Sequence, residues 1–162
     1  MKKIRIVFSL MVVLMFVISS NTYSQSGKIP PFKMIQANGK LFSAQDLPIG
    51  KPVIIIYFSP DCEDCHNFIE AMLLRMDDFW NASIAMITYQ PVPNVAQYVL
   101  KNKLNIYPNI YIGTEENFFV VRYYYNVKRF PFIALYNKNG DLIKIWSKNE
   151  NIDDLSNRLN AL

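Results

Sequence analysis

The chain has 162 residues, of which 51% are hydrophobic and 19% charged, and its formal net charge at pH 7 is +4. Its apolar and aromatic content is sufficient for the core of one ordinary domain. Removing Lys2, Lys3 and Arg5, which lie at the start of the chain, lowers the charge from +4 to about +1. The rest of the chain therefore lacks the basic surface typical of nucleic-acid-binding proteins, and no nucleic acid is expected among its partners.

The first residues predict a signal peptide. The three basic residues precede the apolar stretch Ile6 to Ile18, which is shorter than the roughly 20 residues that a membrane-spanning helix needs. The segment Thr22-Tyr23-Ser24 offers small side chains at the cleavage-site positions and favours cleavage after Ser24. We expect a signal peptide at residues 1–24, one domain at residues 25–162, and export to the periplasm or cell envelope. An uncleaved N-terminal membrane anchor is the alternative.

The first half of the domain predicts a hairpin, a buried strand and a helix. Residues 33–36 are a strand candidate, and Asn-Gly in the turn at 37–40 favours a hairpin with the strand that follows. The continuous apolar run at 53–58, which prolines precede, predicts a buried strand. Apolar side chains then recur at helical spacing from Cys65 to Met76, which predicts a helix that packs one face on a sheet.

The second half predicts further strands and helices. Residues 83–89 predict a strand, the prolines at 91 and 93 a connection, and residues 95–104 a helix. Residues 109–112 predict a short strand, after which Thr114 is expected to cap a short aromatic helix. A β-hairpin is expected at 132–136 and 142–146, and Asn151 is expected to cap a final helix.

Cys62 and Cys65 are the only cysteines, and they lie between the buried strand and the helix. At such a turn the first sulfur lies beside unpaired backbone N–H groups, which favour its thiolate. A purely structural disulfide is the alternative, but a closed loop of about four residues contributes only about 2 kcal/mol, so a structural staple would join more distant positions. The pair therefore predicts thiol–disulfide exchange in an oxidising compartment, which requires an upstream electron-donating redox protein that could be membrane-bound.

Three separated segments carry a family resemblance. They are the cysteine pair with its strand and helix, the segment Tyr125 to Asp141 that contains Pro131, and the opening Pro30-Pro31-Phe32 to Gly39-Lys40 with Gly50-Lys51-Pro52. Together they resemble the thioredoxin-like family, and within it the exported TlpA-type redoxins of the alkyl hydroperoxide reductase/thiol-specific antioxidant superfamily.

The resemblance implies an α/β thioredoxin-like fold, in which helices flank a central mixed β-sheet and a redoxin-type extension precedes it. It also implies that Cys62 is the nucleophile, that Cys65 is the resolving cysteine of a redox-active disulfide, and that Pro131 follows a cis peptide bond. Held against the cysteines, the backbone at Phe130 could hydrogen-bond an extended protein disulfide substrate, as in strand addition. No cofactor and no metal are expected.

The sequence also departs from the thioredoxin pattern. Ile56 occupies the position of a buried acid, and Asp61 replaces the usual tryptophan before the first cysteine. A carboxylate about 6 Å away disfavours a thiolate by roughly 0.7–3 kcal/mol, whereas a helix N-terminus favours it by about 0.3–1 and at most about 2 kcal/mol, so the two contributions come close to cancelling. Asp61, Glu63 and Asp64 are therefore expected to keep the pKa of Cys62 only modestly below that of a free thiol, which favours a reductant or isomerase. His66 either tunes the cysteines as well or is an ordinary first-turn residue.

Four other interpretations fit single features. Cys62 to His66 spells the Cys-x-x-Cys-His signature of c-type haem attachment, but a cytochrome would not need the strand before it or the hairpin after it. A zinc site on these residues lacks a fourth ligand. A thiol peroxidase would use Ser59 and Cys62, with Arg122 or Arg129 beside them, but Ile55 replaces its proline. A non-catalytic binding module would instead use the aromatic residues Phe118, Phe119, Tyr123, Tyr124 and Tyr125.

Overall fold

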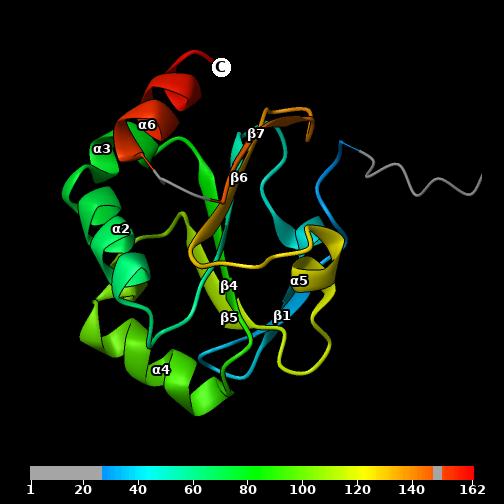
Figure 1. The fold of residues 1–162 in the computed structure, drawn as a ribbon, viewed down its shortest axis with the longest axis vertical. Helices are drawn as coiled ribbons and strands as arrows, with labels where there is room; N and C mark the ends of the chain where they lie inside the picture. Colours follow the sequence, from blue (N-terminus) through cyan, green and yellow to red (C-terminus); the bar gives the residue numbers. More distant parts are fainter. Residues whose placement is uncertain (1–26, 148–150) are drawn as a thin grey trace, which may run out of the picture.

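The computed structural model describes residues 27–147 and 151–162. Its centre is a mixed sheet of seven strands in the order β2-β1-β5-β4-β3-β6-β7 (Figure 1). The strands are β1 (Lys33–Gln36), β2 (Leu41–Ser43), β3 (Val53–Tyr57), β4 (Ser83–Thr88), β5 (Ile110–Thr114), β6 (Phe132–Tyr136) and β7 (Leu142–Trp146). The predicted signal peptide and its cleavage site lie outside the described residues.

Parallel strands form the middle of the sheet. β3 pairs with β4, and β4 with β5, in parallel, whereas the remaining neighbours pair antiparallel. Because parallel neighbours cannot be joined by a tight hairpin, helices connect them. The helices are α2 (Glu63–Leu74), α3 (Met76–Phe79), α4 (Val92–Lys101), α5 (Val120–Tyr124) and α6 (Ile152–Asn160), with 3-10 turns η1 (Ala44–Asp46) and η2 (Leu104–Ile106).

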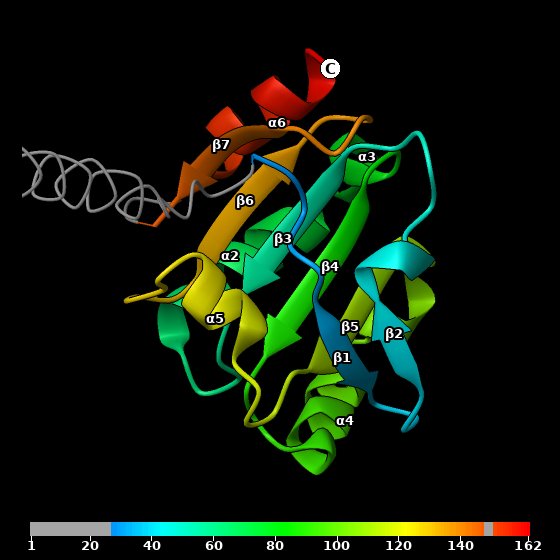
Figure 2. The ribbon, with the colours of Figure 1, turned by 90° about the vertical axis from the view of Figure 1, so that its right-hand side faces the viewer.

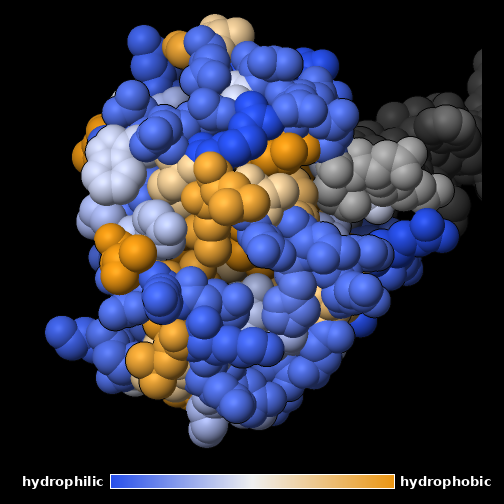
Figure 3. All heavy atoms as spheres, turned by 90° about the vertical axis from the view of Figure 1, so that its left-hand side faces the viewer, coloured by the Kyte–Doolittle hydropathy of each residue, from blue (hydrophilic) through white to orange (hydrophobic). Residues whose placement is uncertain are grey.

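The helices divide unequally between the two faces of the sheet. α2, α3, α4 and α6 cover one face, and α5 lies on the opposite face (Figure 1 and Figure 2). The helix-covered face also shows a group of hydrophobic residues at the surface, surrounded by hydrophilic ones (Figure 3). In the part of the chain that the structure describes, no helix combines the length and the apolar character needed to cross a membrane.

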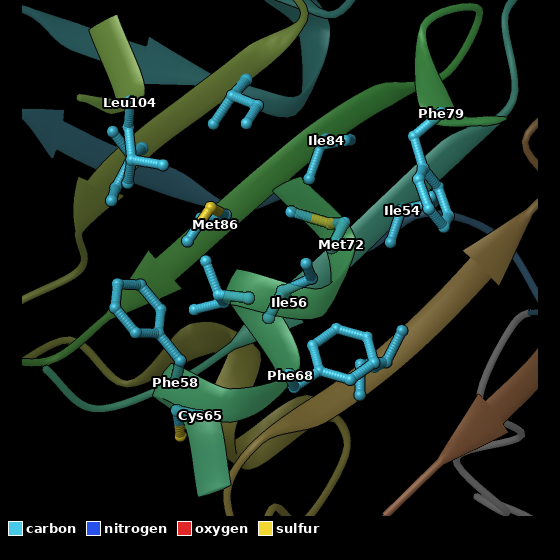
Figure 4. Packing of buried hydrophobic residues seen from close by; sticks show 14 of the residues in the cluster. Ile54, Ile56, Phe58, Cys65, Phe68, Met72, Phe79, Ile84, Met86 and Leu104 are labelled. Carbon is cyan, nitrogen blue, oxygen red and sulfur yellow. The ribbon is translucent and has the colours of Figure 1, made fainter. Parts of the chain in front are cut away.

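The core consists of two clusters, one on each side of the sheet. Ile54 and Ile56 of β3 belong to the cluster under the helices, and Ile55 and Tyr57 belong to the other. Figure 4 shows the first cluster, in which β3 packs on α2. Since successive side chains of a strand point to opposite faces, a strand covered on both faces has a continuous apolar sequence. This explains the uninterrupted run that ends at Phe58.

Several expectations from the sequence are confirmed. The α/β fold class with a central mixed sheet flanked by helices is present, as are both hairpins and the buried strand. The helix after Cys62 is also present, although it ends at Leu74 and α3 follows after Arg75. The Oδ1 atom of Asn151 accepts hydrogen bonds from the backbone N–H groups of Asp153 at 2.8 Å and Asp154 at 3.2 Å, so it caps α6.

Two expectations in the middle of the chain are wrong. The second helix is present, but α4 spans Val92–Lys101 rather than 95–104. The prolines were expected in a connection, yet Pro93 lies in the first turn of α4, where its missing N–H loses no helical hydrogen bond. Thr114 caps no helix, because the strand expected at 109–112 extends to it. Its Oγ1 atom accepts a hydrogen bond from the backbone N–H of Glu116 at 2.9 Å instead.

Candidate active site

The two cysteines lie where β3 passes into α2. The backbone N–H of Phe58 still donates to the carbonyl of Ile87 of the neighbouring strand at 3.0 Å, and the N–H of Cys62 donates to the Ser59 carbonyl at 3.1 Å. Cys62 has extended backbone angles and is the N-cap of α2, where its Sγ accepts a hydrogen bond from the Cys65 N–H at 3.1 Å. A helix start of this kind supplies donors that stabilise negative charge on sulfur.

The cysteines form a disulfide, with their Cα atoms 5.2 Å apart. Their environments differ, because Cys65 is fully buried in the cluster under the helices, whereas Cys62 is only partly buried. Cys62 is therefore the sulfur that an incoming thiol or disulfide can reach first. This asymmetry fits a nucleophile at Cys62 and a resolving cysteine at Cys65.

Phe130 and Pro131 lie at the same edge of the sheet as the cysteines. β6 begins directly after them, antiparallel to β3, so that Phe132 pairs with Tyr57 at the end of β3 that leads to Cys62. The peptide bond between Phe130 and Pro131 is cis. Phe130 is partly buried, and its ring centroid lies 5.8 Å from that of Tyr57.

The acidic residues around the cysteines are exposed. Glu63 and Asp64 occupy the first turn of α2, and Asp61 lies just before Cys62. The Nε2 of Gln90 donates to Asp61 Oδ2 at 3.1 Å, and the Nδ2 of Asn94 donates to Gln90 Oε1 at 3.1 Å. In residues 27–147 and 151–162, none of the three carboxylates has an ion-pair partner within 4.0 Å. Asp61 is therefore held by an amide hydrogen bond, and Glu63 and Asp64 lie at the end of α2 that begins after Cys62. Their effect on the Cys62 thiolate stays a prediction.

His66 is not a fully exposed first-turn residue. It is partly buried, and its ring stacks on that of Tyr98 of α4 at a centroid distance of 5.5 Å. Together with Asp61 and Lys101 it lines a small cavity of about 210 Å³ between the cysteine turn and α4. The structure thus places all eight candidate site residues at one edge of the sheet.

Several solved structures of redox proteins are similar to this chain. A secreted disulfide oxidoreductase from Mycobacterium tuberculosis, described as homologous to DsbE of E. coli, has a TM-score of 0.67 and 21% identity over 82% of this chain and 96% of that one. DsbF from the same organism has a TM-score of 0.61 and 18% identity over 81% and 94%. The exposed lipoprotein thioredoxin of Streptococcus pneumoniae has a TM-score of 0.56 and 19% identity over 82% and 99%.

The chain has a thioredoxin-like fold. No protein-family model matches the chain, and no curated protein sequence matches it. The likeness to solved structures, at about one identical residue in five, establishes the fold. In this thioredoxin-like fold, Cys62 and Cys65 occupy the start of α2, and Pro131 precedes β6.

The sequence-based analysis missed Glu115, which organises α5. Glu115 is only 2% exposed, and it follows β5 directly. Its Oε2 accepts a hydrogen bond from the backbone N–H of Val121 at 2.9 Å, and its Oε1 accepts one from that of Arg122 at 3.4 Å. Burial, and then the neighbouring Glu115 carboxylate, raise the pKa of Tyr57. The sequence does contain a signal for this role, because Glu115 is an acidic residue between a strand and an apolar helix. Thr114 was preferred as the cap because threonine is a common N-cap residue.

The sequence-based analysis also missed the left-handed backbone conformation of Phe119. Phe119 has φ +48° and ψ +32°, which is a left-handed conformation that a bulky residue adopts at a cost on the order of 1–3 kcal/mol. Its ring contacts Tyr89 and Tyr123 at centroid distances of 6.4 and 6.0 Å. The Arg122 guanidinium lies over the Phe119 ring at 5.5 Å and over the Tyr89 ring at 5.7 Å. These contacts offset the strain and fix the Phe119 side chain.

In the part of the chain that the structure describes, no three His, Cys, Asp or Glu side chains come together in a group that could hold a metal ion. Arg122, which a peroxidase would place beside the sulfur, is instead held over aromatic rings.

Proposed function

We propose that this protein is an exported thiol–disulfide oxidoreductase that reduces or isomerises disulfides in other proteins. The observation that supports the proposal is the arrangement of Cys62 and Cys65 on a thioredoxin-like fold. One sulfur is accessible at a helix N-terminus, the other is buried behind it, and Phe130 and Pro131 lie at the same edge of the sheet. Such an arrangement suits two successive thiol–disulfide exchanges.

In the reductive direction, the Cys62 thiolate attacks one sulfur of a substrate disulfide. A bond forms between Cys62 and that sulfur, and the other substrate sulfur leaves as a thiolate, which takes up a proton. Cys65 then loses its proton and attacks Cys62, so the substrate's second sulfur leaves as a thiolate. The protein ends with the Cys62–Cys65 disulfide, and two electrons have passed to the substrate. A dithiol redox protein upstream must return these electrons by the same exchange in reverse.

The residues around Cys62 bear on the direction of this reaction. Asp61, Glu63 and Asp64 oppose the stabilisation of the Cys62 thiolate by the start of α2, so we expect a reductant or isomerase. Phe130 would bind the substrate backbone in extended form. Export accords with the secreted and surface-exposed nature of two of the similar proteins.

The test is a redox titration of the protein lacking residues 1–24, in dithiothreitol buffers, with intact mass measured after alkylation. A reversible two-electron transition between about −300 and −120 mV is expected, toward the low end for a reductant. The Cys65→Ser variant should accumulate a mixed disulfide with a protein substrate, and the Cys62→Ser variant should not. The proposal would be overturned if Cys62 and Cys65 underwent no thiol–disulfide exchange with any of these disulfides. Rapid hydrogen peroxide consumption would favour a peroxidase.

A further inference from the structure

We infer that the cavity between the cysteine turn and α4 binds the zwitterionic end of a cystine-like amino-acid disulfide and presents its sulfur to Cys62. This inference rests on the proposed function and deepens it, because it adds a class of small substrate to the protein disulfides. None of the residues that line the cavity belongs to the segment of Phe130 and Pro131. The site is therefore separate from the place proposed for a protein substrate.

One face of α4 and the cysteine turn form the walls of the cavity. The residues of α4 that line it recur every three or four positions, as one helical face does, and they are Asn94, Gln97, Tyr98 and Lys101. Asp61 and His66 line it from the side of the cysteines. Polar and charged side chains from two separate segments therefore converge on one small space.

Cys62 borders this cavity. Asp61 directly precedes Cys62, and the backbone N–H of His66 donates to the Cys62 carbonyl at 3.1 Å. Because the residues before and after Cys62 line the cavity, a ligand held there lies beside this cysteine. Cys62 is also the accessible member of the pair, whereas Cys65 is fully buried.

The two charged residues of the cavity have opposite signs and are not paired. Asp61 and Lys101 both line it, but in residues 27–147 and 151–162 neither forms an ion pair within 4.0 Å. Among the described residues only the Gln90 amide donates to the Asp61 carboxylate, through Oδ2. Opposite charges that face one space without pairing are complementary to a zwitterion. An α-amino acid carries the required ammonium and carboxylate on one carbon atom.

The rings at the cavity wall suit the rest of such a ligand. The His66 and Tyr98 rings stack at a centroid distance of 5.5 Å. Tyr98 is only 4% exposed, and in the described part of the chain its hydroxyl has no hydrogen-bond partner. Burial raises the pKa of Tyr98 to about 12, so the hydroxyl keeps its proton at neutral pH. A buried donor without a partner is unfavourable, which favours a ligand that carries an acceptor such as a carboxylate.

The size of the cavity selects a small ligand. A water molecule occupies about 30 Å³ of the liquid, so a cavity of about 210 Å³ accommodates about seven non-hydrogen atoms. Cysteine has this number, its sulfur included, whereas a nucleotide or a peptide of several residues is too large. The size, the two opposite charges and the position beside Cys62 together favour one half of a cystine molecule.

In the reaction, the sulfur of the cavity-bound half faces Cys62. The Cys62 thiolate attacks this sulfur, a bond forms between them, and the other cysteine leaves as a thiolate that takes up a proton. Cys65 then loses its proton and attacks Cys62, so the bound cysteine leaves as a second thiolate. Two electrons have passed from the dithiol to cystine. The upstream dithiol redox protein of the proposed function returns them.

Binding is measured without exchange by nuclear magnetic resonance of His66. It is the only histidine in the chain, so its imidazole signals report on the cavity without ambiguity. The oxidised protein is titrated with S-methyl-L-cysteine, which has both charges, and with 2-(methylthio)ethylamine and 3-(methylthio)propanoate, which each have one. The His66 signals should shift and saturate with S-methyl-L-cysteine at a concentration about 5-fold lower than with either analogue, as for the loss of one ion pair.

Exchange rates test the same site with a matched pair of variants, Lys101→Gln and Lys103→Gln. Both remove one positive charge at the end of α4, but only Lys101 lines the cavity. The reduced protein is mixed with cystine, cystamine or 3,3′-dithiodipropionate, and each rate is divided by that of the same disulfide with dithiothreitol. Lys101→Gln should lower the rates of the two disulfides that carry carboxylates about 3- to 5-fold and leave cystamine unchanged. Lys103→Gln should change none of the three rates.

The inference is overturned if the three S-methyl ligands shift the His66 signals equally or not at all. It is also overturned if the two lysine variants react with cystine at the same rate. Neither result affects the reduction of protein disulfides, so the proposed function would stand. If the reduced protein instead exchanges with no disulfide, the proposed function fails, and the His66 titration still decides whether the cavity binds the amino acid.

Discussion

The Glu115→Ala substitution tests whether one buried carboxylate holds α5 in place. It removes the acceptor of the Val121 N–H, at 2.9 Å, and of the Arg122 N–H, at 3.4 Å. A hydrogen bond to a charged group contributes about 1.5–3 kcal/mol, and the longer bond contributes less. Because the first of these N–H groups is buried, water cannot replace the lost partner. The substitution also removes the free-energy cost of burying the carboxylate. This gain offsets part of the loss and gives the lower end of the expected range. We therefore expect a loss of about 2–4 kcal/mol in the free energy of unfolding.

Urea unfolding followed by tyrosine and tryptophan fluorescence measures this loss. With an m value of about 2 kcal/mol/M, the midpoint should fall by about 1–2 M. Glu115→Gln is the matched control, because its amide oxygen can still accept from Val121, and it should lose about half as much. Hydrogen exchange at Val121 and Arg122 should accelerate in Glu115→Ala. A Glu115→Ala midpoint within about 0.3 M of the wild type would refute the reasoning.

Two further predictions concern the sheet and α6. Gly113→Ala should cost about 1–3 kcal/mol in urea unfolding, because a Cβ atom there would lie 2.7 Å from the Ile35 carbonyl oxygen and 2.9 Å from Met34 Cγ. Gly27→Ala, whose Cβ meets nothing within 4 Å, should leave the midpoint unchanged, and equal midpoints for the two variants would contradict the packing argument.

The Asp154 carboxylate accepts from Lys144 Nζ at 2.6 Å and Trp146 Nε1 at 2.8 Å, and these bonds lower its pKa to about 2. A lowered carboxylate pKa contributes stability that is complete above the unfolded value near 4 and is lost as the pH falls through about 2. Asp154→Asn should therefore lose less stability than the wild type between pH 4 and 2 in thermal unfolding, and parallel losses would argue against the assignment.

The sequence predicts the strands and hairpins well because their signals are local. Asn-Gly turns, the apolar run at 53–58 and the Asn151 cap each require only neighbouring residues. The error at the start of α4 has a local cause as well. Pro93 was interpreted as a helix breaker, although proline fits the first turn of a helix.

The features around α5 depend on tertiary contacts that local patterns do not contain. Glu115 caps a helix whose first capped N–H lies six residues further along the chain. The contact between Tyr89 and Phe130 joins residues that no sequence periodicity relates. Equally, the run Tyr123 to Tyr125 does not reveal which tyrosine is exposed. The structure separates them, with Tyr125 buried at 8% and Tyr123 exposed at 74%.

The contacts of Gly27 and Lys28 set a limit on proteolytic trimming from the N-terminus. The Gly27 carbonyl accepts a hydrogen bond from the Leu142 N–H at 2.6 Å, and the Tyr124 hydroxyl donates to the Lys28 carbonyl at 3.1 Å. Lys28 also pairs with Asp141 across an isolated β-bridge. A chain that begins at Gln25 keeps all of these contacts, whereas one cut after Lys28 loses these hydrogen bonds and the ion pair with Asp141. Any N-terminal trimming that keeps these contacts must therefore stop before Gly27.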